Sequence, residues 1–212
     1  MASKRRSGLA NDRRAFNYYY PKISVIYPKN ESEPVCPSIS LGDIATLVGT
    51  TYTLNANTTI LACQTIIIPA GYELVVPSGF TLTNYGRINN QGTIDISGTI
   101  INYYILYNNN GSIYCTGNII NNNGSIIYNG SGSNFDVVGA IFNNGGVIYN
   151  IGTFTNVTAV IYNYNNGTIT NDNSFNFIAG ATLYNADGSS TCGTGILNGT
   201  FPPTATGTNC PP

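Results

Sequence analysis

The chain has 212 residues, which is enough for one domain with an appendage, and its formal net charge is −1. Only 8% of the residues are charged, where about a quarter is usual, and histidine and tryptophan are absent. The missing histidine excludes Ser-His-Asp and Cys-His catalysis, and together with the missing Cys-x-x-Cys spacing it argues against a zinc site.

Residues 1–35 are predicted to form an extended, basic arm. Seven of the eight basic residues lie within the first 29 positions, where Asp12 is the only acid. This asymmetry indicates a tether to an anionic partner, such as nucleic acid, an acidic protein surface or lipid headgroups, and the alternative is a flexible, solubilising tail. Three consecutive tyrosines are expected to dock into a groove of a partner or to cover one end of the body that follows. The residues expected to anchor the chain are Lys4, Arg5, Arg6, Arg13, Arg14, Tyr18, Tyr19 and Tyr20.

Residues 36–85 are predicted to be capping strands. Two apolar runs, Ile66–Ile68 and Leu74–Val76, are each followed by a Pro-x-Gly turn. Strands at the end of a stacked sheet expose unpaired backbone groups, so a capping segment is needed to prevent edge-to-edge association.

Residues 86–200 contain a repeated turn signal, Asn-Asn-Gly-(Ser/Thr)-Ile. Successive glycines of the series are 19 to 22 residues apart, and within one period three short apolar stretches appear. Three short strands separated by turns make one coil of a three-sided β-solenoid. The full copies of the signal are Asn109–Ile113, Asn122–Ile126 and Asn165–Ile169, and Asn143–Ile148 is a looser one.

The fold prediction is therefore an all-β, single-chain, three-sided parallel β-solenoid with about 19–22 residues per coil and an extended N-terminal arm. Strand alternation predicts that Ile113 and Cys115 point inward and that Tyr114 points outward. Asparagines at equivalent positions, such as Asn150 and Asn171, are expected to stack as hydrogen-bonded amide ladders. An Asn-rich disordered tract is the alternative, but the regular apolar positions argue against it.

The interval between Gly111 and Gly124 breaks the rule, because it is only 13 residues. This short interval predicts that one side of the coil is missing or that the strand register shifts there. In the next coils we expect Ile169 to match Ile148, Phe175 to match Phe154, and Ala181 to match Val160.

Residues 201–212 are expected to terminate the ladder, because their prolines provide no backbone donor. The cysteines flank both ends of the solenoid region, and disulfides there would staple those ends, although the connectivity does not follow from sequence. The candidates are Cys36, Cys63, Cys192 and Cys210. Cys115 is expected to be a small, buried, apolar residue.

The segment Ile68-Pro69-Ala70-Gly71 and the run Leu82–Ile94 resemble the Asn/Gly-rich β-solenoid repeat proteins of large DNA viruses and bacterial surfaces. The similarity extends over roughly residues 65–200. It implies a structural role, as a capsid decoration, a fibre or an adhesin.

Catalysis is not expected. Parallel β-helices include polysaccharide lyases and hydrolases, which need clustered carboxylates with a base nearby. Counted from the glycine of its own coil, each repeat-region acid takes a different position, so no shared face is predicted. No cofactor and no metal site are expected. These acids are Asp95, Asp136, Asp172 and Asp187, and Arg87 is the only base in the region.

Eight Asn-x-(Ser/Thr) sequons are interpreted as by-products of the turn signal rather than glycosylation sites, because no signal peptide precedes them. They begin at Asn30, Asn57, Asn110, Asn123, Asn129, Asn156, Asn166 and Asn198. No recognition motif accompanies the arginine pairs of the arm, so specific nucleic-acid readout is not expected. No stretch approaches the length of a membrane span.

We expect a structural protein of a large assembly, a virion, in which the chain is a minor capsid, cement or fibre protein assembled in the host cytoplasm. Its partners would be other structural subunits bound through residues 1–35, with a homo-oligomer or a nonspecific anionic partner as further options. The alternative is an adhesin at an extracellular surface that binds glycans through rows including Tyr149 and Tyr162. A polysaccharide lyase or hydrolase is the third option.

Overall fold

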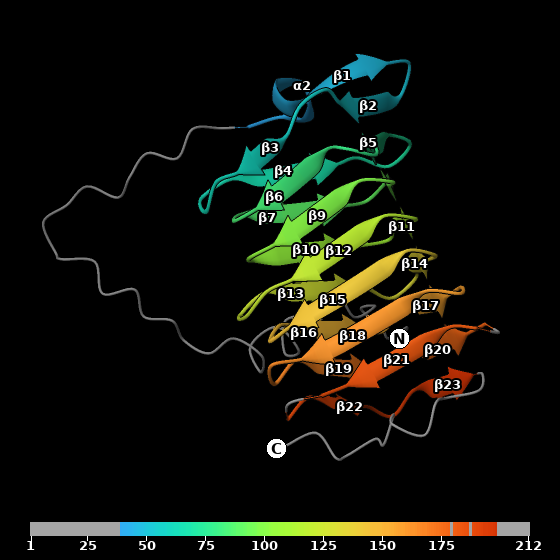
Figure 1. Ribbon diagram of the computed structural model, residues 1–212. Coiled ribbons are helices and arrows are strands. Elements are labelled where there is room, and N and C mark those ends of the chain that lie inside the picture. The colour runs from blue at the N-terminus through green and yellow to red at the C-terminus, as the bar shows by residue number, and fades with distance from the viewer. Residues whose placement is uncertain (1–38, 179, 187, 199–212) are drawn as a thin grey trace, which may run out of the picture. The chain divides into compact units, whose positions relative to one another are not determined.

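The chain winds into a column of stacked coils with three β-sheets as its sides (Figure 1). The computed structural model describes residues 39–178, 180–186 and 188–198. Each coil contributes one strand to each sheet in turn, and from β2 onward the strands of neighbouring coils pair in parallel within each sheet. The predicted three-sided parallel β-solenoid is confirmed.

We call the sheets A, B and C in the order in which the chain visits them. Sheet A contains β1 (Ala45–Val48), β2 (Thr51–Leu54), β5 (Glu73–Val76), β8 (Thr93–Ile96), β11 (Ser112–Cys115), β14 (Asn134–Val137), β17 (Thr153–Asn156), β20 (Ser174–Phe177) and β23 (Ile196–Asn198). Sheet B contains β3 (Thr58–Ile60), β6 (Thr81–Asn84), β9 (Thr99–Asn102), β12 (Asn118–Asn121), β15 (Ala140–Asn144), β18 (Val160–Tyr164) and β21 (Thr182–Asn185). Sheet C contains β4 (Thr65–Ile68), β7 (Arg87–Asn90), β10 (Ile105–Asn108), β13 (Ile126–Asn129), β16 (Val147–Asn150), β19 (Thr168–Asn171) and β22 (Ser190–Cys192).

A short helix and a hairpin cover the first coil. Helix α2 (Leu41–Ile44) buries Leu41 and Ile44 against the core, and β1 pairs antiparallel with β2. The backbone N–H and the hydroxyl of Ser40 both donate to Oδ2 of Asp43, and these bonds hold the pKa of that carboxyl below its usual value. The antiparallel strand ends the parallel ladder on this side, as the predicted capping strands require.

Most strands have four residues, of which the second and fourth point into the column. In most strands the second position carries an aliphatic or phenyl side chain that stacks on its equivalents in neighbouring coils, with Tyr52 and Thr191 among the exceptions in the end coils. Ile113 and Cys115 are buried and Tyr114 is exposed, as predicted. Three phenylalanines of sheet A, Phe135, Phe154 and Phe175, stack with ring centroids 4.8 and 4.4 Å apart.

The fourth position differs between the sheets. In sheet A it is apolar in most coils, as at Val76, Ile96 and Val137, whereas in sheets B and C it is asparagine almost throughout. These asparagines form two ladders inside the column. The sheet B ladder comprises Asn84, Asn102, Asn121, Asn143, Asn163 and Asn185, and the sheet C ladder comprises Asn90, Asn108, Asn129, Asn150 and Asn171.

Both ladders have the same polarity. Nδ2 of each asparagine donates to Oδ1 of the asparagine in the following coil, at 2.7–2.8 Å, and most also donate to a backbone carbonyl beyond the next corner. Asn129, for example, donates to Oδ1 of Asn150 and to the carbonyl of Thr153. Oδ1 of Asn84, the first member of its ladder, is buried and accepts no hydrogen bond in the described residues, because Ile60 occupies the equivalent position one coil earlier. The predicted stacking of Asn150 on Asn171 is confirmed.

Three glycines of the repeated signal, Gly111, Gly146 and Gly167, make room for these ladders, whereas Gly124 has open space around it. A Cβ on Gly111 would approach Nδ2 of Asn90 and Oδ1 of Asn108 to 2.6 and 2.9 Å. The left-handed backbone falls on the asparagine in two copies, with φ of 59° at Asn110 and 62° at Asn166, and on the glycine in a third, with φ of 76° at Gly124. The repeated signal therefore reflects close packing of three of its glycines against the ladder asparagines as well as a turn.

The short interval between Gly111 and Gly124 now has an explanation. Gly111 precedes β11 of sheet A, whereas Gly124 precedes β13 of sheet C, so the two glycines occupy different corners and two complete sides separate them. No side is missing and no register shifts. Registered partners in successive coils are 18 residues apart at Arg87 and Ile105 and 24 at Thr58 and Leu82, a slightly wider range than predicted.

The predicted matches of Ile148 with Ile169 and of Phe154 with Phe175 are confirmed. The match of Val160 with Ala181 is wrong by one residue, because Val160 pairs with Thr182. The corner before β21 is one residue longer than the corner before β18, so the residue that pairs with Val160 lies one position later than predicted. The parallel ladder also already includes β3 to β6, so the regular coils begin before residue 86.

Asn129→Asp tests the polarity of the ladder. The carboxylate has the same shape as the amide but donates nothing, so it would place an acceptor against Oδ1 of Asn150 at the present 2.8 Å separation. We expect the free energy of unfolding at pH 7 to fall by about 2–4 kcal/mol, because buried groups lose their partners. Chemical denaturation measures the loss, which should shrink at pH 3, where a protonated acid donates again.

Asn123→Asp is the matched control, because Asn123 is an exposed corner residue six positions away. A second readout is trypsin, since Arg87 is the only lysine or arginine between residues 39 and 198 and lies inside β7. Cleavage there should accelerate in Asn129→Asp only. Equal losses in the two variants would contradict the ladder's role.

Candidate functional surfaces

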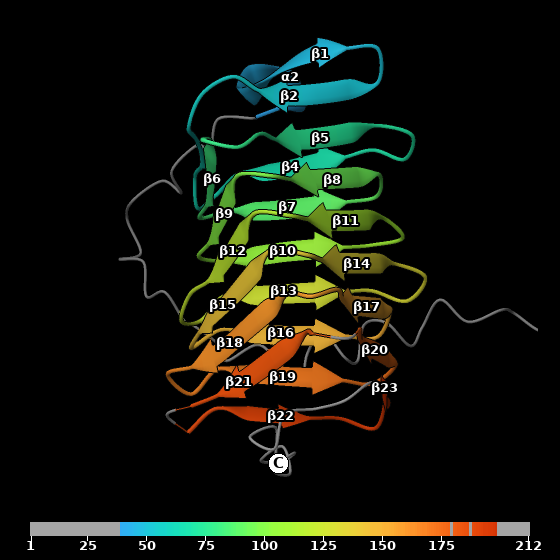
Figure 2. The same cartoon turned by 45° about the vertical axis from the view of Figure 1, so that its right-hand side comes forward.

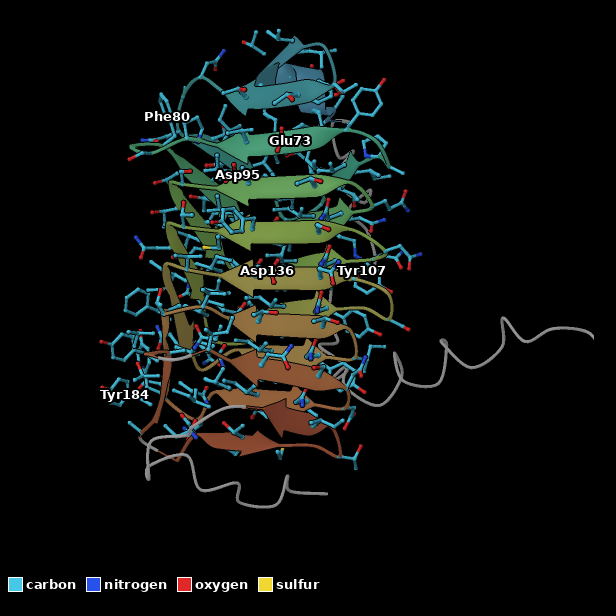
Figure 3. The ribbon with its side chains drawn as sticks, turned by 90° about the vertical axis from the view of Figure 1, so that its right-hand side faces the viewer. Glu73, Phe80, Asp95, Tyr107, Asp136 and Tyr184 are labelled. Carbon is cyan, nitrogen blue, oxygen red and sulfur yellow. The ribbon has the colours of Figure 1, made fainter. Side chains whose placement is uncertain are left out.

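The three outer faces of the column differ in charge. In the described strands of sheet A, Glu73, Asp95 and Asp136 point outward and no basic residue accompanies them (Figure 3). The strands of sheet B carry no charged residue, and those of sheet C carry Arg87 alone. Each face therefore suits a different kind of partner.

The acidic face of sheet A contains a column of side chains at one register position. Asp95 pairs with Tyr114 of the next coil, and Tyr114 pairs with Asp136 of the coil after that. Glu73 lies two residues before Val75, the direct partner of Asp95. Partial burial raises the pKa of Asp95, and the negative charge of Glu73 raises it further. Oδ1 of Asp95 is enclosed and accepts no hydrogen bond within the described part of the chain.

The prediction that the repeat-region acids share no face is thus wrong for Asp95 and Asp136. Counting from the nearest glycine conceals the match, because the glycines occupy different corners and the coils differ in length. Alignment on the inward residues Ile94, Ile113 and Phe135, which are registered partners, would have revealed it.

Asp172 has a structural role at the corner between sheets C and A. Its Oδ2 accepts from the hydroxyl of Tyr149 at 2.9 Å, and its Oδ1 accepts from the backbone N–H and the hydroxyl of Thr194 at 3.0 and 3.2 Å. These bonds join three successive coils. Asp187 lies outside the described residues.

Strands β6 to β21 of sheet B lie one above another along the column (Figure 2). The outward side chains of the sheet B strands are uncharged. Rings of Phe142, Tyr162 and Tyr184 stack on one another with centroids 5.3 and 5.4 Å apart and planes within 14° of parallel. They line a shallow depression with Tyr164 and Ala186. Because the rings stack along the column, their faces contact each other and their edges point outward.

Sheet C also has a row of rings, formed by Tyr107, Tyr128 and Tyr149. Their centroids are 4.7 and 5.5 Å apart, and the planes are tilted by 33° and 41°. The glycan-binding alternative expected Tyr149 and Tyr162 to contribute to binding rows on one face of the solenoid. The structure places Tyr149 on sheet C and Tyr162 on sheet B.

The anchoring residues expected in the arm, Lys4 to Tyr20, lie outside the described residues, as do Cys36 and Cys210. Cys63 and Cys192 are both disulfide-bonded, at opposite ends of the column. The connectivity of the terminal staples stays a prediction.

Cys115 is free and fully buried in β11. Burial raises the pKa of its thiol to about 12, and the charge of Asp95 contributes to the increase. Such a thiol is present as the unreactive protonated form at neutral pH. The expected role as a small core residue is confirmed.

The sequon asparagines fall into two groups. Asn129 and Asn156 are fully buried, so an attached glycan does not fit the folded column. Asn57, Asn110, Asn123 and Asn166 are exposed at corners. Asn30 and the side chain of Asn198 are outside the described part of the chain.

Over residues 39–198, with the two gaps noted above, no three histidine, cysteine or acidic side chains gather closely enough to hold a metal ion. No helix in the same ranges combines the length and apolarity needed to cross a membrane. Comparison of the chain with protein-family models, with curated proteins and with solved structures found no match.

Asp95→Asn is expected to stabilise the protein at pH 7. A carboxyl whose pKa is raised on folding favours the protonated form, so its contribution is most favourable below the unfolded pKa and is lost as the pH rises through the folded one. We expect a gain on the order of 0.5 kcal/mol at pH 7, typical of surface changes, that disappears toward pH 4. Thermal unfolding across this pH range measures it.

Asp136→Asn removes a charge from the same column farther from Glu73 and serves as the control. A larger gain in the control, or a gain in Asp95→Asn that grows as the pH falls, would refute the assignment.

Cys115 should be inert to thiol reagents in the folded protein at pH 8, because reagent access requires the coil to open. Mass spectrometry of the Cys115 peptide after iodoacetamide treatment measures this, with denatured protein as the reference. Labelling at the denatured rate under native conditions would contradict the packing of β11.

Proposed function

We propose that this protein is a structural component of a large assembly, a virion, in which it serves as a minor capsid, cement or fibre protein. The observation that carries the proposal is the pair of continuous asparagine ladders inside an unbroken parallel column. Such a column is a rigid spacer whose length is set by the number of coils. The resemblance to Asn/Gly-rich solenoid proteins of viruses and bacterial surfaces supports the same role.

Rigidity follows from how the backbone and the core are satisfied. Inner strands bond to strands on both sides, and the buried polar side chains bond along the column rather than across it. Chains of hydrogen-bonded amides polarise one another in a low-dielectric interior, which strengthens each member. A protein of this kind transmits force and resists proteases without a moving part, as a scaffold requires.

Catalysis is not part of the proposal. Asp95 and Asp136 share a column, but Tyr114 separates them by two coils, and the strands of the acidic sheet contain no base. Lyases and hydrolases need an acid and a base or nucleophile held around one substrate atom. Inactivity on acidic polysaccharides is the outcome that the proposal requires.

The alternative is a glycan-binding adhesin at an extracellular surface. Its support is the shallow, ring-lined depression of sheet B. The stacking of Phe142, Tyr162 and Tyr184 on each other weakens that interpretation, because sugars pack on the faces of aromatic rings, and both faces of Tyr162 and one face of each neighbour are occupied by rings of the row. A glycan array distinguishes the two functions, and specific binding would favour the adhesin.

Anchoring through the basic arm is tested by deleting residues 1–29. The column is expected to keep its β-type circular dichroism, since its ladders lie within residues 39–198. Incorporation into the particle should be lost, because the arm contains seven of the eight basic residues. Co-sedimentation of tagged protein with assembled particles measures it.

A full-length variant with Lys4, Arg5, Arg6, Arg13 and Arg14 changed to glutamine separates charge from chain length. This variant should incorporate into the particle poorly, and lowering the salt concentration should not restore its incorporation. Normal incorporation of the truncated chain would overturn the anchoring role.

A further inference from the structure

The outer face of sheet B is graded in side-chain size along the column. At the third strand position, where side chains point outward, the residues become larger from coil to coil. Thr59 and Thr83 come first, Ile101 and Ile120 follow, and Phe142, Tyr162 and Tyr184 come last. The two last tyrosines are 39% and 45% exposed, although their rings are largely apolar.

This face lacks the features that recognise a charged partner, because no strand of sheet B carries a charge. Seven strands spaced about 4.8 Å apart and four residues wide make a patch of roughly 450 Å². Within this face a continuous run of large side chains, Ile101, Ile120, Phe142, Tyr162 and Tyr184, is flanked by threonines, and a continuous exposed apolar run of this kind marks an interaction site on a soluble protein. A second copy of this face could approach it without charge repulsion, whereas two sheet A faces would oppose their carboxylates.

Two faces with this gradient fit each other in one orientation. If the columns run antiparallel about a two-fold axis along the central strand β12, Thr83 of one copy faces Tyr162 of the other, and Ile101 faces Phe142. Ile120 and Asn118 then meet their own copies on the axis. Each level combines one small and one large residue or two medium ones, so the sheets stay at the constant separation of about 10 Å that packed sheets adopt.

A parallel arrangement would be wedge-shaped. It would gather Phe142, Tyr162 and Tyr184 of both copies at one end and the threonines of both copies at the other. The size gradient therefore selects the antiparallel pair. This pairing of large with small residues is what close packing of an interface requires.

We propose that the outer face of sheet B is a self-association surface on which a second copy of the chain packs antiparallel. Its area is below the roughly 800 Å² per partner of stable complexes, so the contact is weak and becomes populated at the high local concentration of an assembly. It uses no residue of the arm, so it stands independently of the anchoring proposed above.

Sedimentation equilibrium of the full chain from 10 µM to 1 mM tests the proposal, with reversible dimers expected at the upper end. Tyr162→Arg places a charge in the contact and should raise the dissociation constant at least about tenfold. Thr155→Arg is the matched control, because Thr155 takes the third position of the sheet A strand in the same coil. It should leave the dissociation constant unchanged.

Orientation is tested by mixing Thr83→Cys protein with Tyr162→Cys protein and adding a short bismaleimide, since the facing backbones are too far apart for a disulfide. A mixed cross-linked dimer is expected, and neither protein should cross-link alone at that yield. Deletion of residues 1–29 should leave the dimer intact, which distinguishes this contact from anchoring.

A chain that stays monomeric at 1 mM overturns the proposal, and so does a partner of another kind that binds this face while copies do not. Association that Thr155→Arg disrupts and Tyr162→Arg leaves unchanged overturns it as well.

Discussion

Backbone hydrogen bonds join each coil of the column to the coils before and after it, and this ladder restricts what every strand and corner can do. Each coil must present its backbone groups at the height where the next coil needs them, so every side has a strand of nearly fixed length and every corner must absorb the differences between coils. The asparagine ladders apply the same rule to side chains. Their amides repeat along the column at the spacing of the strands, so each ladder buries a polar group in successive coils with its partner in the next one, and only Oδ1 of Asn84, where the sheet B ladder begins, lacks a partner among the ladder atoms described.

The distribution of polar and apolar residues inside the column has a geometric reason. Asparagines fill the last inward position of sheets B and C, where the chain is about to turn and the carbonyls of the next side come within reach. In sheet A the same position is aliphatic in most coils, and the one asparagine there, Asn156, leaves its buried Oδ1 without a partner in the described residues. The mainly aliphatic fourth position of sheet A and the asparagine ladders of sheets B and C together determine which of the three sheets each segment joins.

The chemistry of each outer face is set by the side chains that do not point into the interior of the column. Because inward positions are occupied by ladder and core residues, the identity of each face depends on the first and third positions alone. These positions include three acids on sheet A and three adjacent tyrosines on sheet C, and on sheet B they are uncharged and graded in size. A column with three distinct faces can contact different neighbours on different sides, which is consistent with the scaffold role and the self-association surface that we propose.

The coil, the direction of its side chains and the stacking of asparagines could all be predicted from local sequence signals. Turn glycines, alternating apolar positions and repeated asparagines are local signals, and each coil repeats them. Tertiary structure alone decided which corner each glycine occupies, as Gly111 and Gly124 illustrate, and which outward residues share a column, as Asp95 and Asp136 do. Registry depends on the summed lengths of the corners between two strands, and one extra corner residue, such as the one before Thr182, changes the sequence separation at which later side chains find their partners.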